Sequence, residues 1–143
     1  MRIKASLPIL ALLPLLGGCG YKGPTAAARQ PTPQAVAMEH MFADINQIRG
    51  FLYGSGSQGG ATEAATDLVS WSKRMPELFP PELASQEYVD MSPERARTAT
   101  EAMGTNAAEL LAAVQGGNHA TIGDRLAATE HNGCGACHLS GTE

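Results

Sequence analysis

Residues 92–118 have the sequence SPERARTATEAMGTNAAELLAAVQGGN, which contains the start, the apolar stripe and the end of one long helix. Ser92 can cap a helix, and Pro93 suits the first helical position. Gly116 and Gly117 favour the end of a helix. Between these ends, apolar residues recur at helical spacing: Ala96, Ala99, Met103, Ala107, Leu110, Leu111 and Val114. The stretch therefore predicts an amphipathic helix with one buried side.

Three further segments show the same period. A first helix is expected from Gln34, with an apolar side made of Met38, Met41, Phe42, Ile45, Ile48 and Leu52. A second is expected over about residues 61–75 and should end at Pro76. A fourth begins after a capping Asn118 and buries Ile122, Leu126 and Thr129. No segment alternates with period two for long enough to form a strand, so the sequence predicts an all-α protein, an antiparallel up-down four-helix bundle.

Composition limits the function classes. The chain has 143 residues, of which 43% are hydrophobic, so one globular domain is expected rather than a disordered chain. Ten Lys and Arg against 14 Asp and Glu give a formal net charge of −4, so the chain lacks the basic footprint of a nucleic-acid-binding protein. Three cysteines are too few for a disulfide scaffold.

A five-residue motif near the end of the chain carries the chemistry: Cys134-Gly135-Ala136-Cys137-His138. Cys-x-x-Cys-His is the attachment signature of c-type haem. Residues three apart share one face of a helix, so both thiols can reach the two vinyl groups at one edge of a porphyrin. His138 follows directly and can place its imidazole under the iron. The motif predicts one covalently attached haem c.

Three other readings of these residues are weaker. A thioredoxin-type redox pair needs a βαβ context, which is absent from the expected fold. A zinc site made of Cys134, Cys137, His138 and His131 would lack the usual separated ligand pairs. A disulfide between the two cysteines would close a very short loop and gain little stability. A second motif, Gly54–Gly59, fits G-x-G-x-x-G but follows a helix instead of a strand, so we expect an interhelical loop there.

The first 18 residues are typical of a secretory signal. Arg2 and Lys4 precede an apolar run, residues 7–16, which is too short to span a bilayer. The run ends in Leu16-Gly17-Gly18-Cys19, which resembles the lipobox of bacterial lipoproteins. That resemblance implies a diacylglyceryl group on the Cys19 sulfur and cleavage just before it. An ordinary signal with an incidental cysteine is the alternative.

These features divide the chain into three parts. Residues 1–18 are expected to be a lipoprotein signal peptide, and residues 19–33 a lipid-anchored flexible tether rich in Gly, Pro, Ala and Thr. Residues 34–143 are expected to form the four-helix haem domain. Gly20 after the lipidated cysteine resembles the enterobacterial sorting signal for the outer membrane, which puts the protein on the periplasmic side of a bacterial membrane.

A haem motif at the end of a four-helix chain resembles the class II c-type cytochromes, which comprise cytochrome c′ and the cytochrome c-556 group. The resemblance covers about residues 34–138, and residues 75–80 (MPELFP) look like the family's exit from its second helix. The family's distal residue comes from the first helix, and its pattern implies Met38 as the sixth iron ligand, with Met41 as the runner-up. The family's usual arginine four residues earlier is replaced by Gln34, and no basic residue follows His138.

The resemblance to class II cytochromes implies an electron carrier rather than an enzyme, with redox proteins as partners. The resemblance to lipoproteins implies that the protein is attached to a membrane through a lipid on Cys19. An acidic surface would suit a basic partner. The alternative is a gas-binding haem protein like cytochrome c′, with an open distal side for nitric oxide or carbon monoxide. A third reading is a non-haem lipoprotein with a structural role. Class II relatives often pair through their first two helices, so the resemblance leaves a homodimer open.

Overall fold

The computed structural model describes residues 30–80 and 92–138. The chain divides into two units, Met1–Gln30 and Pro31–Glu143, and all the described helices lie in the second. The predicted signal peptide and Cys19 lie outside the described residues, as do residues 19–29 of the predicted tether.

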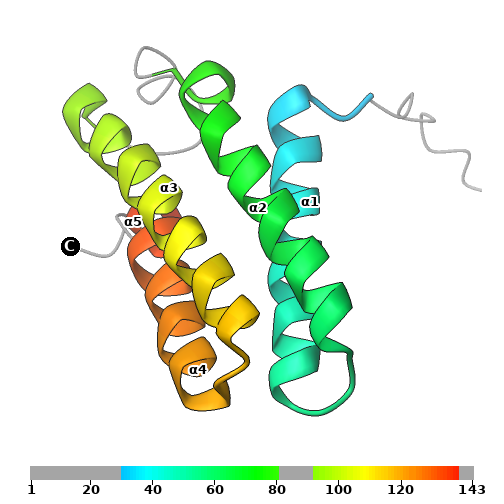
Figure 1. The fold of residues 1–143 in the computed structure, drawn as a ribbon. Helices are drawn as coiled ribbons and strands as arrows, with labels where there is room; N and C mark the ends of the chain where they lie inside the picture. The colour runs from blue at the N-terminus through cyan, green and yellow to red at the C-terminus, as the bar shows by residue number, and fades with distance from the viewer. Residues whose placement is uncertain (1–29, 81–91, 139–143) are drawn as a thin grey trace, which may run out of the picture. The chain divides into compact units, whose positions relative to one another are not determined.

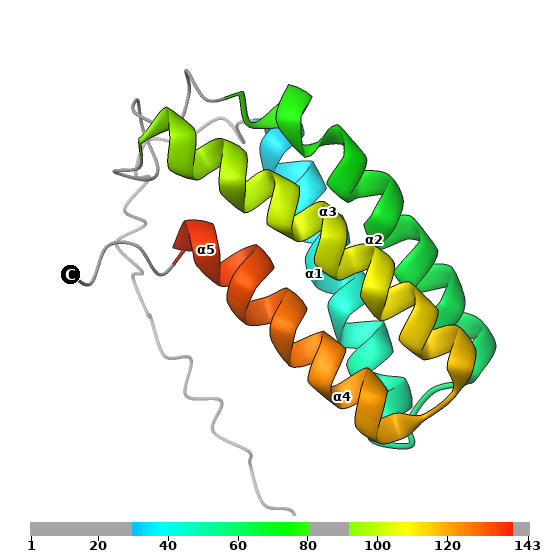
Figure 2. The same ribbon diagram turned by 60° about the vertical axis from the view of Figure 1, so that its left-hand side comes forward.

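The second unit is an antiparallel four-helix bundle (Figure 1). The helices are α1 (Pro33–Leu52), α2 (Gln58–Leu78), α3 (Pro93–Gly116) and α4 (His119–Ala128). The chain continues from α4 without a break through the π-helical segment η2 (Thr129–Cys134) and the short α5 (Gly135–His138), and the three form one rod (Figure 2). No strand occurs in residues 30–80 or 92–138, so the all-α prediction is confirmed.

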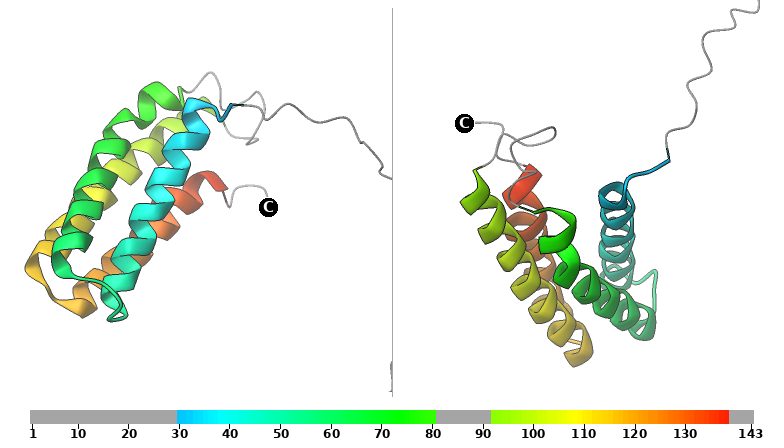
Figure 3. Two further views of the ribbon diagram at one scale, coloured as in Figure 1. Left: turned by 90° about the vertical axis from the view of Figure 1, so that its right-hand side faces the viewer. Right: turned by 90° about the horizontal axis from the view of Figure 1, so that it is seen from above.

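Neighbours along the chain pack against each other, and α1 closes the bundle by packing against α4. Figure 3 shows this arrangement from the side and from above. The core between the helices is made mainly of alanine, branched aliphatic and methionine side chains. Its fully buried members include Ile48, Leu68, Met103, Leu110, Val114 and Ile122. Burying a side chain of this size contributes roughly 1.5–3 kcal/mol relative to leaving it in water.

Each of the four long helices begins with a side-chain cap. The cap residue accepts a hydrogen bond from the backbone N–H three positions later, at 3.1–3.3 Å. The four caps are Thr32, Ser57, Ser92 and Asn118. Gly117 ends α3 with a φ of 70°, a conformation that glycine adopts without strain. The expected limits of α3 and the cap of α4 are therefore confirmed.

The second helix departs from the expectation at both ends. It begins at Gln58 rather than about residue 61, so the end of the glycine-rich segment Gly54–Gly59 is already helical. It also continues past Pro76 to Leu78. Proline lacks the N–H that would bond to the carbonyl of Ser72, but later residues can still bond, and Phe79 N donates to Met75 O at 2.7 Å. A proline so close to the end of a helix therefore removes only one backbone hydrogen bond and does not end the helix.

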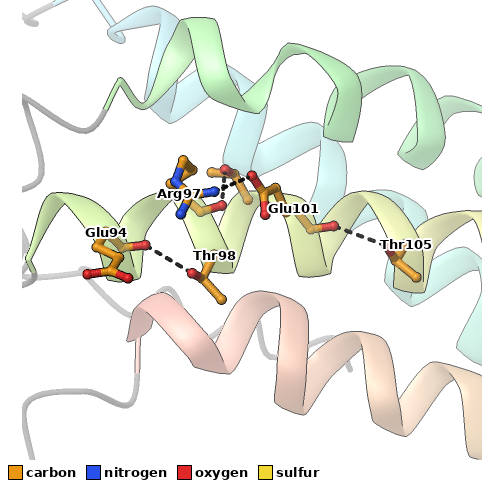
Figure 4. A network of polar contacts seen from close by, with 6 residues as sticks. Glu94, Arg97, Thr98, Glu101 and Thr105 are labelled. Carbon is orange, nitrogen blue, oxygen red and sulfur yellow. Dashed lines mark hydrogen bonds and ion pairs between the residues drawn. The ribbon is translucent and has the colours of Figure 1, made fainter.

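The outward face of α3 is polar (Figure 4). Arg97 and Glu101 form an ion pair at 2.9 Å one turn apart, and threonine hydroxyls along the same face donate to backbone carbonyls one turn earlier. Both charged side chains are mostly exposed, so the pair contributes only about 0.3–0.5 kcal/mol. The buried residues of α3, such as Met103, lie on the opposite side of the helix.

Candidate functional site

A cavity of about 400 Å³ opens between α1 and the rod formed by η2 and α5. Its walls bring together residues from every part of the bundle except α4. They are Met38, Met41, Phe42, Ile45 and Arg49 from α1, Met75 from α2, Met103 from α3, and Glu130, Gly133, Cys134, Cys137 and His138 from η2 and α5. All the predicted haem-binding residues within the described part of the chain therefore line one cavity.

The Cys-x-x-Cys-His motif forms one wall. Cys134 is the last residue of η2, and Cys137 and His138 lie on α5. Both cysteines are half-buried, and His138 is exposed. Burial raises the pKa of both thiols; the carboxylate of Glu130 raises that of Cys134 further, whereas Arg95 opposes the shift at Cys137. Both thiols are therefore neutral at physiological pH.

The zinc interpretation needs Cys134, Cys137, His138 and His131 around one metal ion. His131, the fourth ligand that such a site would need, is exposed and does not line the cavity. Within residues 30–80 and 92–138, no three or more His, Cys, Asp or Glu side chains group closely enough to hold a metal ion.

Gly133 allows the motif to approach α3. A Cβ at this position would lie 2.5 Å from Met103 Sδ and 3.6 Å from Met103 Cα, so only glycine fits without a shift. The six residues of η2 adopt the rare π-helical winding, which is frequent at functional sites. Sequence reasoning missed Gly133, although it stands four residues after Thr129 on the buried stripe of this rod.

The opposite wall carries two thioethers from α1. Met41 is 4% exposed and belongs to the hydrophobic core, whereas Met38 is half-buried and packs against the edge of that core. His40 is exposed and does not line the cavity. Its ring instead stacks on Trp71, with centroids 5.1 Å apart and planes inclined by 20°.

One ion pair borders the cavity. The guanidinium of Arg49 binds the carboxylate of Glu130 and also the side-chain oxygen of Asn46, so α1 is tied to η2 one turn before Cys134. The amide of Gln34, which replaces the family's usual arginine, donates to Leu78 O at 3.0 Å and links α1 to the end of α2. Arg49 is the basic residue on the cavity wall within the described chain.

These residues fit a covalently attached haem. Two thiols three residues apart and an adjacent imidazole stand on one wall, and mainly apolar and thioether side chains face them. A bound haem would be held by Cys134, Cys137 and His138, and it would supply a one-electron iron couple in a largely apolar surrounding.

The comparison with known protein families supports a haem site in this cavity. A family model described as cytochrome C′ matches residues 32–140, well over half of the chain. No curated protein and no solved structure matches the chain. The matched range begins at the cap of α1 and includes the whole haem motif. The chain belongs to the cytochrome c′ family, whose members carry covalently bound haem c.

Proposed function

We propose that this protein is a membrane-anchored cytochrome with one haem c that carries single electrons between redox proteins on the periplasmic side of a bacterial membrane. The observation that carries the proposal is the cavity, where Cys134, Cys137 and His138 face the thioethers of Met38 and Met41. No acid–base pair lines the cavity wall formed by the described residues, apart from the paired Arg49 and Glu130, so we propose a carrier rather than an enzyme.

Met38 is the sixth iron ligand in this proposal. Met41 is 4% exposed and belongs to the hydrophobic core, so displacing its side chain toward a metal would open a void there. Met38 sits at the edge of the core, where its side chain can turn toward the cavity without such a loss. A thioether and an imidazole that both bound the iron would raise its potential, which suits electron transfer.

The anchor and the partners follow from the sequence. A lipid on Cys19 would hold the bundle at a membrane. No described helix has the length and hydropathy to cross a bilayer. The outer membrane is the proposed location. Cleavage before Cys19 would remove Arg2 and Lys4 and leave 8 Lys and Arg against 14 Asp and Glu, a formal net charge of −6. This charge suits a basic redox partner, whose association should weaken as salt rises.

The visible spectrum of the haem-loaded protein tests this proposal. We expect a six-coordinate, low-spin spectrum in both oxidation states and little response to carbon monoxide. Met38→Ala should convert the spectrum to high spin, whereas Met41→Ala should keep it low spin. A low-spin spectrum that survives Met38→Ala but not Met41→Ala would transfer the ligand role to Met41.

Gas binding is the second candidate function. The distal wall presents the apolar side chains of Phe42 and Ile45 beside the methionines, so a vacant sixth position would face an apolar pocket. A five-coordinate, high-spin reduced spectrum that changes on adding carbon monoxide would favour this role and contradict electron transfer through a Met38-ligated iron.

A further inference from the structure

Asp44 is a buried carboxyl that the proposed function does not use. It lies on α1, is 9% exposed, and its Oδ2 has no hydrogen-bond partner among the described residues. A buried carboxylate without a partner is unfavourable, and taking up a proton removes the charge. The Asp44 carboxyl is therefore a group that can change its protonation state within the folded protein.

The groups around Asp44 favour the neutral form. Burial and the facing carboxylate of Asp67 on α2 raise the pKa of Asp44 to about 6, against a smaller opposing effect of His40 on its own helix. Glu63 of α2 also borders this region. On the side of α1 that meets η2, the charge of Arg49 is matched by Glu130.

Protons can reach Asp44 from water. An open groove of about 470 Å³ lies between α1 and α2, and Asp44, Glu63 and Asp67 are among the residues that line it. The groove is separate from the haem cavity and shares no lining residue with it.

Asp44 is nonetheless close to that cavity along α1. It directly precedes Ile45 and follows Met41 by three residues, and both of these line the cavity. With a rise of 1.5 Å per residue, all three lie within one turn of helix. Charges inside a protein are screened less than charges in water, so a negative charge added in the cavity would favour a neutral Asp44.

We propose that the protein takes up one proton at Asp44 when it takes up one electron. This inference rests on the proposed electron-carrier function. A reduced partner loses one electron to the haem-loaded protein, and the Asp44 carboxylate binds one proton from water in the groove to become a neutral carboxyl. When the electron passes to an oxidised partner, Asp44 returns the proton to water. The net charge of the protein is then the same in both states.

The midpoint potential of the haem-loaded protein, titrated from pH 4.5 to 8.5, tests the inference. The potential should be constant at low pH and fall as the pH rises above about 6, with a limit of about 59 mV for each tenfold drop in proton concentration. Asp44→Asn should remove this fall. Asp67→Asn, which keeps the carboxyl but removes its negative neighbour, should move the fall to lower pH.

An infrared difference spectrum gives a second readout. Reduction of the wild-type protein near pH 6.5 should produce a carbonyl band of a protonated carboxyl, and Asp44→Asn should lack it. An unchanged slope in Asp44→Asn would show that another group takes the proton and would overturn the inference. A haem-loaded protein with a flat potential would overturn it as well, leaving the electron-carrier function intact. A chain without haem would overturn both.

Discussion

Gly133 of η2 lies directly against Met103 of α3, so that a Cβ at position 133 would come within 2.5 Å of Met103 Sδ. This contact joins the haem-attachment segment to the long helix whose ends the sequence defines most clearly. Met103 is 1% exposed, and its side chain therefore has little room to move aside. The position of the two cysteines depends on this close approach.

Gly133→Ala should destabilise the protein. The added methyl group forces the Met103 thioether to shift inside a filled core, and such overpacking costs about 1–3 kcal/mol. Guanidinium unfolding of the haem-loaded protein measures the loss. Gly104→Ala is the matched control, because nothing lies within 4 Å of the Cβ it would add. Alanine in a helix interior should stabilise that variant by about 0.5–1 kcal/mol. Equal changes in the free energy of unfolding for the two variants would contradict the close contact between Gly133 and Met103.

The ion pair between Arg49 and Glu130 should contribute only modestly. Both side chains are 37% exposed, and ion pairs in contact with water contribute about 0–1 kcal/mol. A double-mutant cycle with Arg49→Met and Glu130→Gln should give a coupling free energy of about 0.5 kcal/mol. The more exposed pair Arg97 and Glu101 should give less. A coupling above about 2 kcal/mol would mean that the pair is effectively buried.

Asp44→Asn should stabilise the protein above pH 6 and leave it unchanged near pH 4. The pKa of Asp44 is raised from 3.8 to about 6, so its ionisation is harder in the folded chain than in the unfolded one. Wild-type stability is then highest below pH 4 with respect to this group and falls as the pH rises through about 6. We expect a gain of about 1–2 kcal/mol at pH 7.5, discounted because the groove admits water.

Denaturant unfolding at pH 4 and pH 7.5 checks this expectation. The same free-energy difference at both pH values would show that the substitution acts through shape rather than charge. Asp67→Asn should produce a smaller gain at pH 7.5, since it removes only the repulsion and not the burial of Asp44.

Asn118→Ala should weaken the start of α4. The Asn118 side chain accepts a hydrogen bond from Thr121 N at 3.1 Å, and loss of such a cap costs about 1 kcal/mol. Asn118→Asp keeps an acceptor in the same place and should retain most of the stability. Thermal unfolding of the two variants side by side distinguishes them, and equal losses would exclude capping as the cause.

Local signals predicted the elements that local chemistry controls. Ser92, Pro93 and Gly117 act on their immediate neighbours, and α3 therefore begins and ends where the sequence indicates. Pro76 misled the expectation for α2, because proline restricts the turn before it and does not stop the few residues after it.

The residues of the site likewise fall into those that the sequence predicts and those that only the packing of the helices reveals. Cys134, Cys137 and His138 form a contiguous motif that can be read without a structure. Gly133, Arg49 and Asp44 gained their roles from packing against α3, η2 and α2, which no short stretch of sequence encodes. Asp44 is also polar at the edge of an apolar stripe, where periodicity predicts a solvated side chain.

Covalent attachment of haem is tested by the mass of the tryptic peptide that carries the motif. The protein is purified from a host that matures c-type cytochromes and is denatured before digestion. Cleavage after Arg125 releases residues 126–143, which contain the motif and are separate from any lipid on Cys19. We expect a peptide heavier than its sequence mass by one haem, and a peptide at its sequence mass when Cys134 and Cys137 are both changed to alanine. An unmodified peptide from the wild-type protein would contradict covalent attachment.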